Sequence, residues 1–205
     1  MTSRAQKIAL VDYGMGNLRS VERAFARIGR EVCVTDSPAE LRAADRVVLP
    51  GVGSARDCMT ALRSHGLDDA IRAHIAAGRP YLGICLGLQV LLGEADEGGV
   101  GPCLGVIPGR VQRFPDSLGL AVPHMGWNLV KLEQPHPVLS DDYFYFVHSY
   151  RATRVPERNV LARTDYGESF AAAIGHGSCV AVQYHPEKSQ RAGVELLERF
   201  CAWQP

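Results

Sequence analysis

A short segment with the pattern Gly-X-Cys-X-Gly constrains this chain more than any other feature. Cys85 lies between Gly83 and Gly87. Residues 79–84 before it predict a short buried strand, and residues 86–92 after it predict the start of a helix. Glycines two positions either side of a residue permit a strained strand-to-helix turn and leave room for a substrate. The pattern therefore predicts an α/β fold with a nucleophile at the tip of this turn.

The position of Cys85 favours the reactive form of its thiol. A helix that begins at the next residue directs its positive dipole end and its unpaired N–H groups toward the sulfur, which stabilises a thiolate. The alternative is a buried structural cysteine, which is the commonest role of a lone cysteine. The flanking glycines favour the reactive role.

A candidate general base follows a strand late in the sequence. Residues 180–184 predict a strand, so His185 lies at its carboxyl end, where open α/β sheets assemble their sites. Pro186 ends the strand and fixes the local backbone, which helps Glu187 turn back toward the imidazole. A carboxylate bonded to the far ring nitrogen sets the tautomer and stabilises the imidazolium. The order Cys, His, Glu predicts a catalytic triad.

A glycine-containing turn follows another predicted strand, residues 46–49. Pro50, Gly51, Val52 and Gly53 place backbone N–H groups where they can hold a developing oxyanion. The amide of Leu86, directly after the nucleophile, is a further candidate donor. A plain tight turn is the alternative. No Lys-Ser/Thr pair follows these glycines, so a phosphate cradle is excluded.

Two further segments are candidate substrate contacts. Gln89 lies one helical turn after Cys85 and on the same face, where its amide can bond the amide or the α-carboxylate end of a substrate. The alternative is a polar residue on a helix surface. Residues 147–150 (Val-His-Ser-Tyr) end a strongly aromatic strand. His148 within it is expected to be structural or to lie at the rim, because His185 already fills the role of base.

Composition agrees with one compact domain covering residues 1–205. The chain has 205 residues and equal numbers of basic and acidic side chains, 22 of each. Zero net charge argues against a general nucleic-acid or membrane surface. The six cysteines show no C-x-x-C pair, which argues against a disulfide framework or a zinc site. The polar residues 1–7 do not resemble a signal peptide, and no apolar run would span a bilayer, so we expect a cytoplasmic protein with reduced thiols.

Strands and helices alternate in the first part of the chain, which predicts a mainly parallel, mixed central sheet with helices on both faces. Expected strands are 8–11, 31–35 and 46–49. One helix is expected to begin after Asn17, which would cap it, and another after Ser37, which would form a capping box with Glu40. Further helices are expected to start at Ser54 and to cover residues 67–77 and 189–203. In the last of these, the side chains of Val194, Leu197 and Cys201 are expected to face inward. From residue 104 the pattern changes to strands with short connections, including a hairpin about 175–177.

At this point the sequence resembles a known family, the class I (triad-type) glutamine amidotransferases. The resemblance covers essentially the whole chain and is closest to the glutaminase subunits of imidazole glycerol phosphate synthases. The general motifs are Leu49–Gly53, Gly83–Gly87 with Gln89, Val147–Tyr150 and His185–Ser189. The subgroup is indicated by Asp12–Asn17 and Pro123–Asn128. Leu88 stands where the family usually has Met, a volume-conserving difference.

The resemblance implies a three-layer, flavodoxin-like α/β fold and a cysteine glutaminase. Cys85, His185 and Glu187 would form the triad, and Val52 N–H would join Leu86 N–H in the oxyanion hole beside Gly51. The backbone of residues 147–150 would contact the α-carboxylate of glutamine, beside Gly53 and Gln89. No metal or organic cofactor is implied, because thiol, imidazole and backbone suffice for this chemistry.

A partner is also implied. Ammonia would pass to a cyclase subunit, a (β/α)8 barrel in a heterodimer with this chain, which makes imidazole glycerol phosphate and an aminoimidazole carboxamide ribotide in histidine biosynthesis. Asn17, Trp127 and Lys188 are candidate interface residues. The alternatives are that Asn17 only caps a helix, that Trp127 is a core residue and that Lys188 is a solvated charge. The Val52 N–H is expected to turn into the site only when the partner binds its nucleotide. A free-standing γ-glutamyl hydrolase and a non-catalytic scaffold of the same fold remain alternatives.

Overall fold

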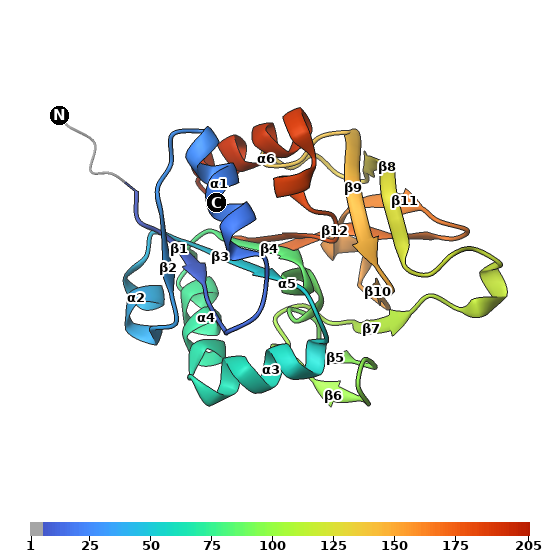
Figure 1. Ribbon diagram of the computed structural model, residues 1–205, viewed down its shortest axis with the longest axis horizontal. Helices are drawn as coiled ribbons and strands as arrows, with labels where there is room; N and C mark the ends of the chain where they lie inside the picture. The colour runs from blue at the N-terminus through green and yellow to red at the C-terminus, as the bar shows by residue number, and fades with distance from the viewer. Residues whose placement is uncertain (1–5) are drawn as a thin grey trace.

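The computed structural model describes residues 6–205, and it has the expected layered α/β arrangement (Figure 1). The polar residues 1–5, which bear on the expectation about a signal peptide, lie outside the described part. A nine-stranded sheet in the order β2-β1-β3-β4-β13-β12-β11-β8-β9 forms the middle layer. Its strands are β1 (Ile8–Val11), β2 (Val32–Thr35), β3 (Arg46–Gly51), β4 (Tyr81–Cys85), β8 (His124–Leu132), β9 (Asp142–His148), β11 (Val160–Asp165), β12 (Ser169–His176) and β13 (Cys179–Val182).

The expected mixed sheet is confirmed, and its two halves differ in direction. The pairings from β2 through β1, β3 and β4 to β13 are parallel. Those from β13 through β12, β11 and β8 to β9 are antiparallel. This division follows the connections, because a parallel pair needs a crossover whereas an antiparallel pair is joined by a short turn. β4 and β13 therefore meet at the centre of the sheet.

Helices cover both faces of the sheet. On one face α1 (Leu18–Arg27) packs against α6 (Gln190–Ala202), and on the other lie α2 (Pro38–Ala43), α3 (Ala55–Ser64) and α4 (Leu67–Ala76) (Figure 1). The central strands β1, β4 and β13 are buried along their whole length, as expected for strands covered on both sides. Each face consequently has its own apolar core.

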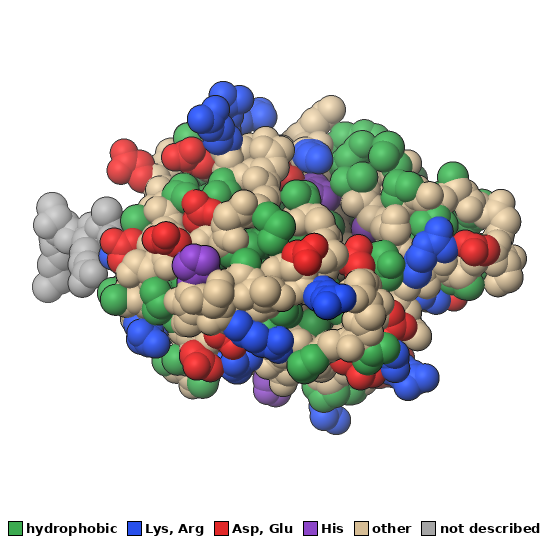
Figure 2. Space-filling model, turned by 60° about the horizontal axis from the view of Figure 1, so that its bottom comes forward, with side chains coloured by type: hydrophobic (Ala, Val, Ile, Leu, Met, Phe, Trp, Pro, Cys, Tyr) green, Lys and Arg blue, Asp and Glu red, His purple; other side chains and the backbone are tan. Residues whose placement is uncertain are grey.

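A second sheet lies beside the α3 face. Its strands are β5 (Glu94–Ala95), β6 (Gly101–Pro102), β7 (Arg110–Arg113) and β10 (Tyr150–Thr153), in the order β10-β7-β5-β6. Single 3₁₀ turns occur at η1 (Asp116–Leu118), η2 (Glu157–Asn159) and η3 (Pro186–Lys188). None of the helices in residues 6–205 combines the length and the apolar character needed to cross a bilayer. Acidic and basic side chains are intermingled over the face in Figure 2, in keeping with zero net charge.

The helix starts confirm part of the expected capping. Ser37 accepts a hydrogen bond from the Glu40 amide, but the return bond of a capping box is missing because the Ser37 amide donates to Thr35 Oγ1 instead. Ser54 caps α3 by accepting from the Asp57 amide. Asn17 is the residue before α1, yet its side chain makes no capping bond. The Asn17 side chain is therefore free for another use.

The helix after Cys85 is shorter than expected. α5 (Leu86–Gln89) is a single turn. The carbonyl groups of residues 90–92 accept hydrogen bonds from the amides of residues 104–107, which end the helix. A one-turn helix has a small dipole, so dipole stabilisation of a thiolate is weaker here than the sequence suggested.

Other boundaries shift by a few residues. The second strand begins at Val32 rather than at residue 31, and β13 ends at Val182 rather than at residue 184. The predicted hairpin is present, with Gly177 in its turn. In α6 Leu197 and Cys201 are buried as expected, and Leu196 is buried as well, whereas Val194 is only partly buried.

Candidate active site

Three neighbouring strands bring the predicted site residues to one edge of the sheet. β4 lies between β3 and β13 and is parallel to both. Cys85 ends β4 and is in register with Gly51, which ends β3. His185 follows the end of β13. Since parallel strands end at the same edge, the residues predicted to be the nucleophile, the oxyanion turn and the base lie at adjacent carboxyl ends.

The backbone at Cys85 has the strained geometry that its flanking sequence predicts. Cys85 has φ 54° and ψ −101°, a conformation that costs a residue with a side chain about 1–3 kcal/mol. A Cβ at Gly83 would lie 2.7 Å from the Gly87 carbonyl carbon, and one at Gly87 would collide with Leu49 O. The glycines thus allow backbone segments to touch. The room they leave is filled by the protein itself, so the expectation that they admit substrate is wrong.

His185 and Glu187 are paired beneath the surface. His185 Nδ1 lies 2.7 Å from Glu187 Oε1, and each side chain is 3% exposed. The turn that brings them together is fixed by Ser189, whose hydroxyl donates to the His185 carbonyl at 2.6 Å and accepts from the Tyr145 amide at 3.0 Å. The imidazole orientation is therefore set by both side-chain and backbone contacts.

The charge state of His185 depends on its two neighbours. Burial by itself would lower the pKa of His185, but hydrogen bonding and charge from Cys85 and Glu187 outweigh burial and raise the pKa to about 10. His185 Nε2 is buried without a hydrogen bond of ordinary geometry, on the ring edge opposite Glu187. Catalytic contacts are commonly long before substrate binds. The arrangement suits an imidazolium beside the Cys85 sulfur at neutral pH.

Gln183 also contacts the sulfur, a residue that the sequence analysis assigned no role. Its Nε2 donates to Cys85 Sγ at 3.5 Å, and its Oε1 accepts from Gln89 Nε2 at 3.2 Å. Gln183 is fully buried. The only feature of the sequence that could have identified Gln183 is its polar side chain in an otherwise apolar segment, two positions before His185. Gln183 donates a hydrogen bond that stabilises negative charge on the sulfur.

Tyr13 underlies the turn proposed for the oxyanion. A Cβ at Gly51 would collide with Tyr13 Oη, so glycine is required there. The Tyr13 hydroxyl is buried without a hydrogen bond of ordinary geometry. Burial and Cys58 raise the pKa of Tyr13, while the nearby Val52 amide opposes that rise. The Tyr13 hydroxyl therefore lies directly against Gly51, the residue before Val52.

A cavity of about 400 Å³ lies over Cys85. The residues that line it are Val52, Gly53, Cys85, Leu86, Gln89, Glu97, Pro123, Val147, His148, Ser149, Tyr150 and Lys188. All the residues that the sequence analysis named as substrate contacts are among them. Glu97 is an addition: it lies between two short strands of the second sheet, and the sequence around it carries no motif that would have identified it.

Gln89 reaches the cavity with its donors already occupied. Its Nε2 donates to Tyr150 O at 3.1 Å and to Gln183 Oε1 at 3.2 Å. The Gln89 carbonyl oxygen remains to accept a hydrogen bond from a substrate. This arrangement favours contact with an amide N–H or an ammonium group over contact with a carboxylate.

His148 belongs to a buried chain of hydrogen bonds. Its Nδ1 lies 2.8 Å from Tyr150 O, which can only accept, so Nδ1 carries the proton and Nε2 accepts. His124 Nδ1, 3.0 Å away, therefore donates to His148 Nε2, and Asn128 Nδ2 donates to His124 Nε2 at 3.2 Å. With both nitrogens occupied, His148 has no free atom for catalysis. This agrees with the structural role expected for His148.

Acid should destabilise the fold through this histidine pair. Burial lowers the pKa of His124 to about 4, and burial together with the nearby charges of His124, His185 and Arg151 lowers the pKa of His148 to about 3. The unfolded chain takes up protons below about pH 6.5, whereas the native pair stays neutral. Between pH 7 and pH 5 each histidine should lower the free energy of unfolding by about 2 kcal/mol.

Urea denaturation of His124→Gln at these two pH values checks that prediction. The pH dependence should be smaller by about the contribution of one histidine. His176→Gln, at an exposed position, should keep the wild-type dependence. The opposite contribution of His185, whose pKa is raised, is common to all three proteins and cancels in the comparison. Equal pH dependence in His124→Gln and wild type would contradict the prediction.

All three predicted interface residues are exposed, and one of them, Lys188, lines the cavity over Cys85. Trp127 is 47% exposed and packs edge-on against Tyr145, with ring centroids 6.1 Å apart. Lys188 Nζ lies 5.9 Å from the same tyrosine ring. Asn17 is also exposed and directly precedes α1, a helix that contacts η3, the turn that contains Lys188. Trp127 is thus a surface residue, and its alternative as a core residue is wrong.

All six cysteines are free thiols. Within residues 6–205, no three or more His, Cys, Asp or Glu side chains are grouped so that they could hold a metal ion.

Comparison with known proteins gives full-length matches. The family described as glutamine amidotransferase class-I matches residues 9–203. Imidazole glycerol phosphate synthase subunit HisH from Nitrosococcus oceani is 50% identical over 203 residues, covering 96% of this chain and 97% of the relative. The subunit of the same name from Methylococcus capsulatus is 48% identical over 211 residues, covering 97% of each.

Solved structures agree at the level of the fold. A crystal structure of a glutamine amidotransferase has a TM-score of 0.76 at 23% identity and covers 95% of this chain and 97% of its own. PurLQS from Thermotoga maritima has a TM-score of 0.76 at 18% identity, covering 97% and 99%. The layered α/β arrangement is therefore shared with proteins of distant sequence.

Proposed function

Since the chain belongs to the class-I glutamine amidotransferase family, we propose that it is the glutaminase subunit of an imidazole glycerol phosphate synthase. It hydrolyses glutamine to glutamate and ammonia. The observation that carries this proposal is the buried His185–Glu187 pair beside the strained Cys85, at the floor of a cavity large enough for an amino acid. The full-length relatives supply the identity of the synthase.

The first half of the reaction uses the thiol and the imidazolium. The Cys85 thiolate attacks the side-chain carboxamide carbon of glutamine, and the carbonyl oxygen becomes an oxyanion held by the Val52 and Leu86 amides. His185 gives its proton to the nitrogen as the C–N bond breaks, so ammonia leaves and a glutamyl thioester remains. Losing one oxyanion donor typically costs about 3 kcal/mol of barrier.

The second half regenerates the thiol. Neutral His185 removes a proton from water, which attacks the thioester, and the imidazolium then faces a free thiolate again. Glu187 holds the ring throughout and stabilises its charge, as the carboxylate does in the Ser-His-Asp template. No group outside the chain is required for either half.

The rest of the cavity would orient glutamine. We assign the α-ammonium group to Glu97 and to the carbonyl oxygen of Gln89, because both present acceptors to the cavity. Burial raises the pKa of Glu97, and a bound ammonium group would offset that cost. The α-carboxylate would lie against the backbone of Ser149 and Tyr150, as the family resemblance implies.

A synthase subunit would receive the ammonia. The relatives' names identify them as subunits of a larger enzyme. We propose a cyclase with a (β/α)8 barrel as the partner, in a heterodimer. Exposed Met125, Trp127 and Tyr143 on β8 and β9, together with Lys188 and Asn17, would form the contact, because exposed aromatic and methionine side chains are typical of protein interfaces. We place the complex in the cytoplasm, where thiols such as Cys85 stay reduced.

Reconstitution tests the proposed function. This chain and a cyclase subunit should copurify, and the complex should form imidazole glycerol phosphate with glutamine as the nitrogen source. Ammonia passed between subunits should not equilibrate with solvent, so an external ammonia trap should leave synthesis unchanged. A chain that hydrolyses glutamine equally well alone would instead favour a free-standing hydrolase.

Partner binding should switch the glutaminase on. A β-branched residue such as Val52 resists peptide rotation more than glycine does, so we infer that the Val52 N–H turns into the site only when the partner is bound. The isolated chain should therefore hydrolyse glutamine slowly, and partner with bound nucleotide should raise kcat far more than it lowers KM. That result identifies an interaction realised only in the transition state. A free subunit as fast as the complex would refute the switch.

A further inference from the structure

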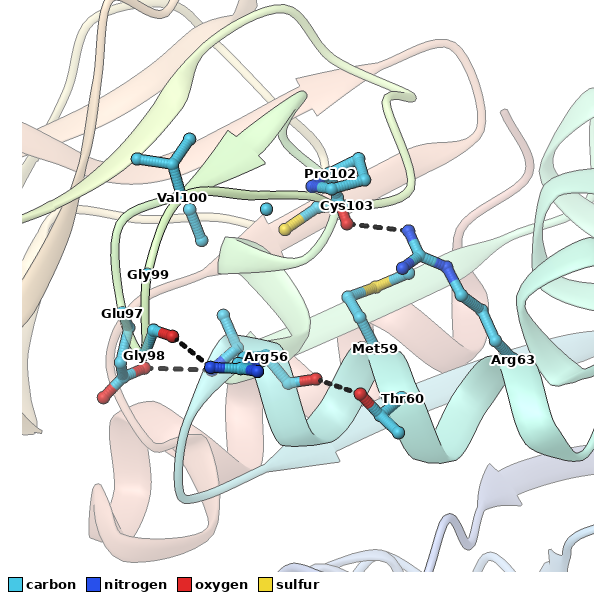
Figure 3. Close-up of a pocket in the computed structure, with 13 residues that line it drawn as sticks. Arg56, Met59, Thr60, Arg63, Glu97, Gly98, Gly99, Val100, Pro102 and Cys103 are labelled. Carbon is cyan, nitrogen blue, oxygen red and sulfur yellow. Dashed lines mark hydrogen bonds between the residues drawn. The ribbon is translucent and has the colours of Figure 1, made fainter.

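A second cavity, of about 360 Å³, lies between α3 and the β5–β6 hairpin, which comprises residues 94–102 (Figure 3). Three hydrogen bonds join the helix to the hairpin. Arg56 Nη1 donates to Gly98 O at 2.6 Å, Arg63 Nη2 donates to Pro102 O at 2.7 Å, and the Ala55 amide donates to Glu97 Oε2 at 2.9 Å. The two arginines are seven residues apart, so they lie two turns apart on one face of α3.

The base of the hairpin is anchored independently of α3, because β5 pairs with β7 in the second sheet and Arg110 bonds both Glu94 and Asp96. The outer part of the hairpin, residues 97–102, has less support, because β6 is an edge strand that pairs with β5 over only two residues. Its tip contains Gly98 and Gly99, which have φ of 76° and 98°, and Val100, which is 65% exposed. Such a tip samples many conformations unless side chains fix it.

Arg56 fits the hairpin in two ways. A Cβ at Gly98 would lie 3.1 Å from Arg56 Cδ and 3.3 Å from its Cβ, so the aliphatic stem packs on the glycine. The guanidinium then donates to the carbonyl of the same residue. Figure 3 shows Arg56 and Arg63 both reaching from α3 to the hairpin.

Glu97 connects this second cavity with the catalytic one. Its side chain lines both. Oε2 is occupied by the Ala55 amide, whereas Oε1 makes no hydrogen bond within the described part of the chain. The position of Oε1 at the substrate therefore depends on how firmly α3 holds the outer part of the hairpin.

We propose that Arg56 and Arg63 are positioning residues for glutamine recognition, which fix the β5–β6 hairpin so that Glu97 meets the α-ammonium group of the substrate. The inference rests on the proposed function. When the arginine bonds are lost, the outer part of the hairpin (residues 97–102) leaves its bound position for part of the time, and the apparent affinity for glutamine falls by that fraction. The thiol, the imidazole and the oxyanion donors are unaffected, so KM changes while kcat does not.

Arg56→Met tests the proposal, because methionine keeps an apolar stem against Gly98 but removes the donor. In the complex with the synthase partner, KM for glutamine should rise about three- to tenfold, and kcat should stay within twofold. Synthesis with ammonium salts should be unchanged. Arg27→Ala, at an exposed position of α1, is the matched control and should match wild type in both constants.

Two further measurements separate positioning from a general loss of structure. With 4-carbamoylbutanoate, which lacks the α-ammonium group, Arg56→Met and wild type should have the same KM. In an enzyme that already carries Glu97→Gln, adding Arg56→Met should raise KM for glutamine by less than a further twofold, because the effects of coupled residues are not additive. The proposal would be overturned if the KM effects of Glu97→Gln and Arg56→Met multiplied, or if Arg56→Met raised KM equally for glutamine and for 4-carbamoylbutanoate.

The outcomes remain distinguishable from failure of the proposed function. A wild-type complex that releases no ammonia from glutamine overturns the function itself. A working complex whose KM is unchanged in Arg56→Met overturns the positioning role alone. If Arg56→Met does not fold, Arg63→Met, at the other end of the hairpin, serves the same comparison.

Discussion

Replacing Cys85 with alanine should abolish glutamine-dependent synthesis and leave ammonium-dependent synthesis intact. Loss of the nucleophile removes covalent catalysis altogether, so glutamine hydrolysis should fall by at least about 10⁴-fold. The partner's chemistry consumes ammonia and does not need the thiol. Alanine also fits the site, because Cys85 lies at the end of a buried strand and packs among apolar residues. Initial rates with glutamine and with an ammonium salt measure the two activities separately.

The other thiols provide the control for that experiment. Cys179 begins β13, at the end of that strand far from His185. Cys179→Ala removes a fully buried sulfur without touching the cavity over Cys85. It should keep its glutaminase turnover and lose only stability, as a core truncation does. Equal loss of synthesis with both nitrogen sources in Cys85→Ala would show that the residue does more than hydrolyse glutamine.

Substitutions at His185 and Glu187 should both be severe but unequal. His185→Asn removes the group that moves the proton, and it should be nearly as damaging as loss of Cys85 because triad members act as a unit. Glu187→Gln keeps the imidazole and removes only the charge that orients it, so it should retain about a hundredfold more activity than His185→Asn. Single-turnover rates of thioester formation compare the two without interference from product release.

The pH profile of Glu187→Gln gives an independent check. The charge and hydrogen bonds of Cys85 and Glu187 raise the pKa of His185 to about 10 against the effect of burial. Without Glu187 that pKa should fall, so the alkaline limb of kcat/KM should move to lower pH. An unchanged alkaline limb, or a Glu187→Gln enzyme slower than His185→Asn, would contradict the division of roles.

The residues predicted to be catalytic come together in the structure because they occur where local motifs and strand ends coincide. The positive φ of Cys85 and the short distance from His185 to Glu187 both follow from residues close together in the chain. The order of the strands then brings Gly51 beside Cys85. Local sequence patterns are sufficient to predict features that depend on residues close together in the chain.

Features that depend on distant pairing were not predictable in the same way. His124 meets His148 because β8 and β9 pair in one particular register, which no local pattern specifies. Glu97 reaches the cavity through a hairpin held by α3. The purpose of Gly87 was misjudged for the same reason, since the atom it avoids belongs to Leu49 on the neighbouring strand.

The position of β13 in the sheet has a consequence for when the enzyme becomes active. β13 enters between β4 and β12, and it carries His185 beside a thiol that was made much earlier in the chain. Until the last strand is synthesised, β4 has an open edge and Cys85 has no base. If His185 is the base, a nascent chain on the ribosome should not hydrolyse glutamine, and neither should any fragment that ends before residue 185. The predicted triad is complete only after the last strand has closed the sheet.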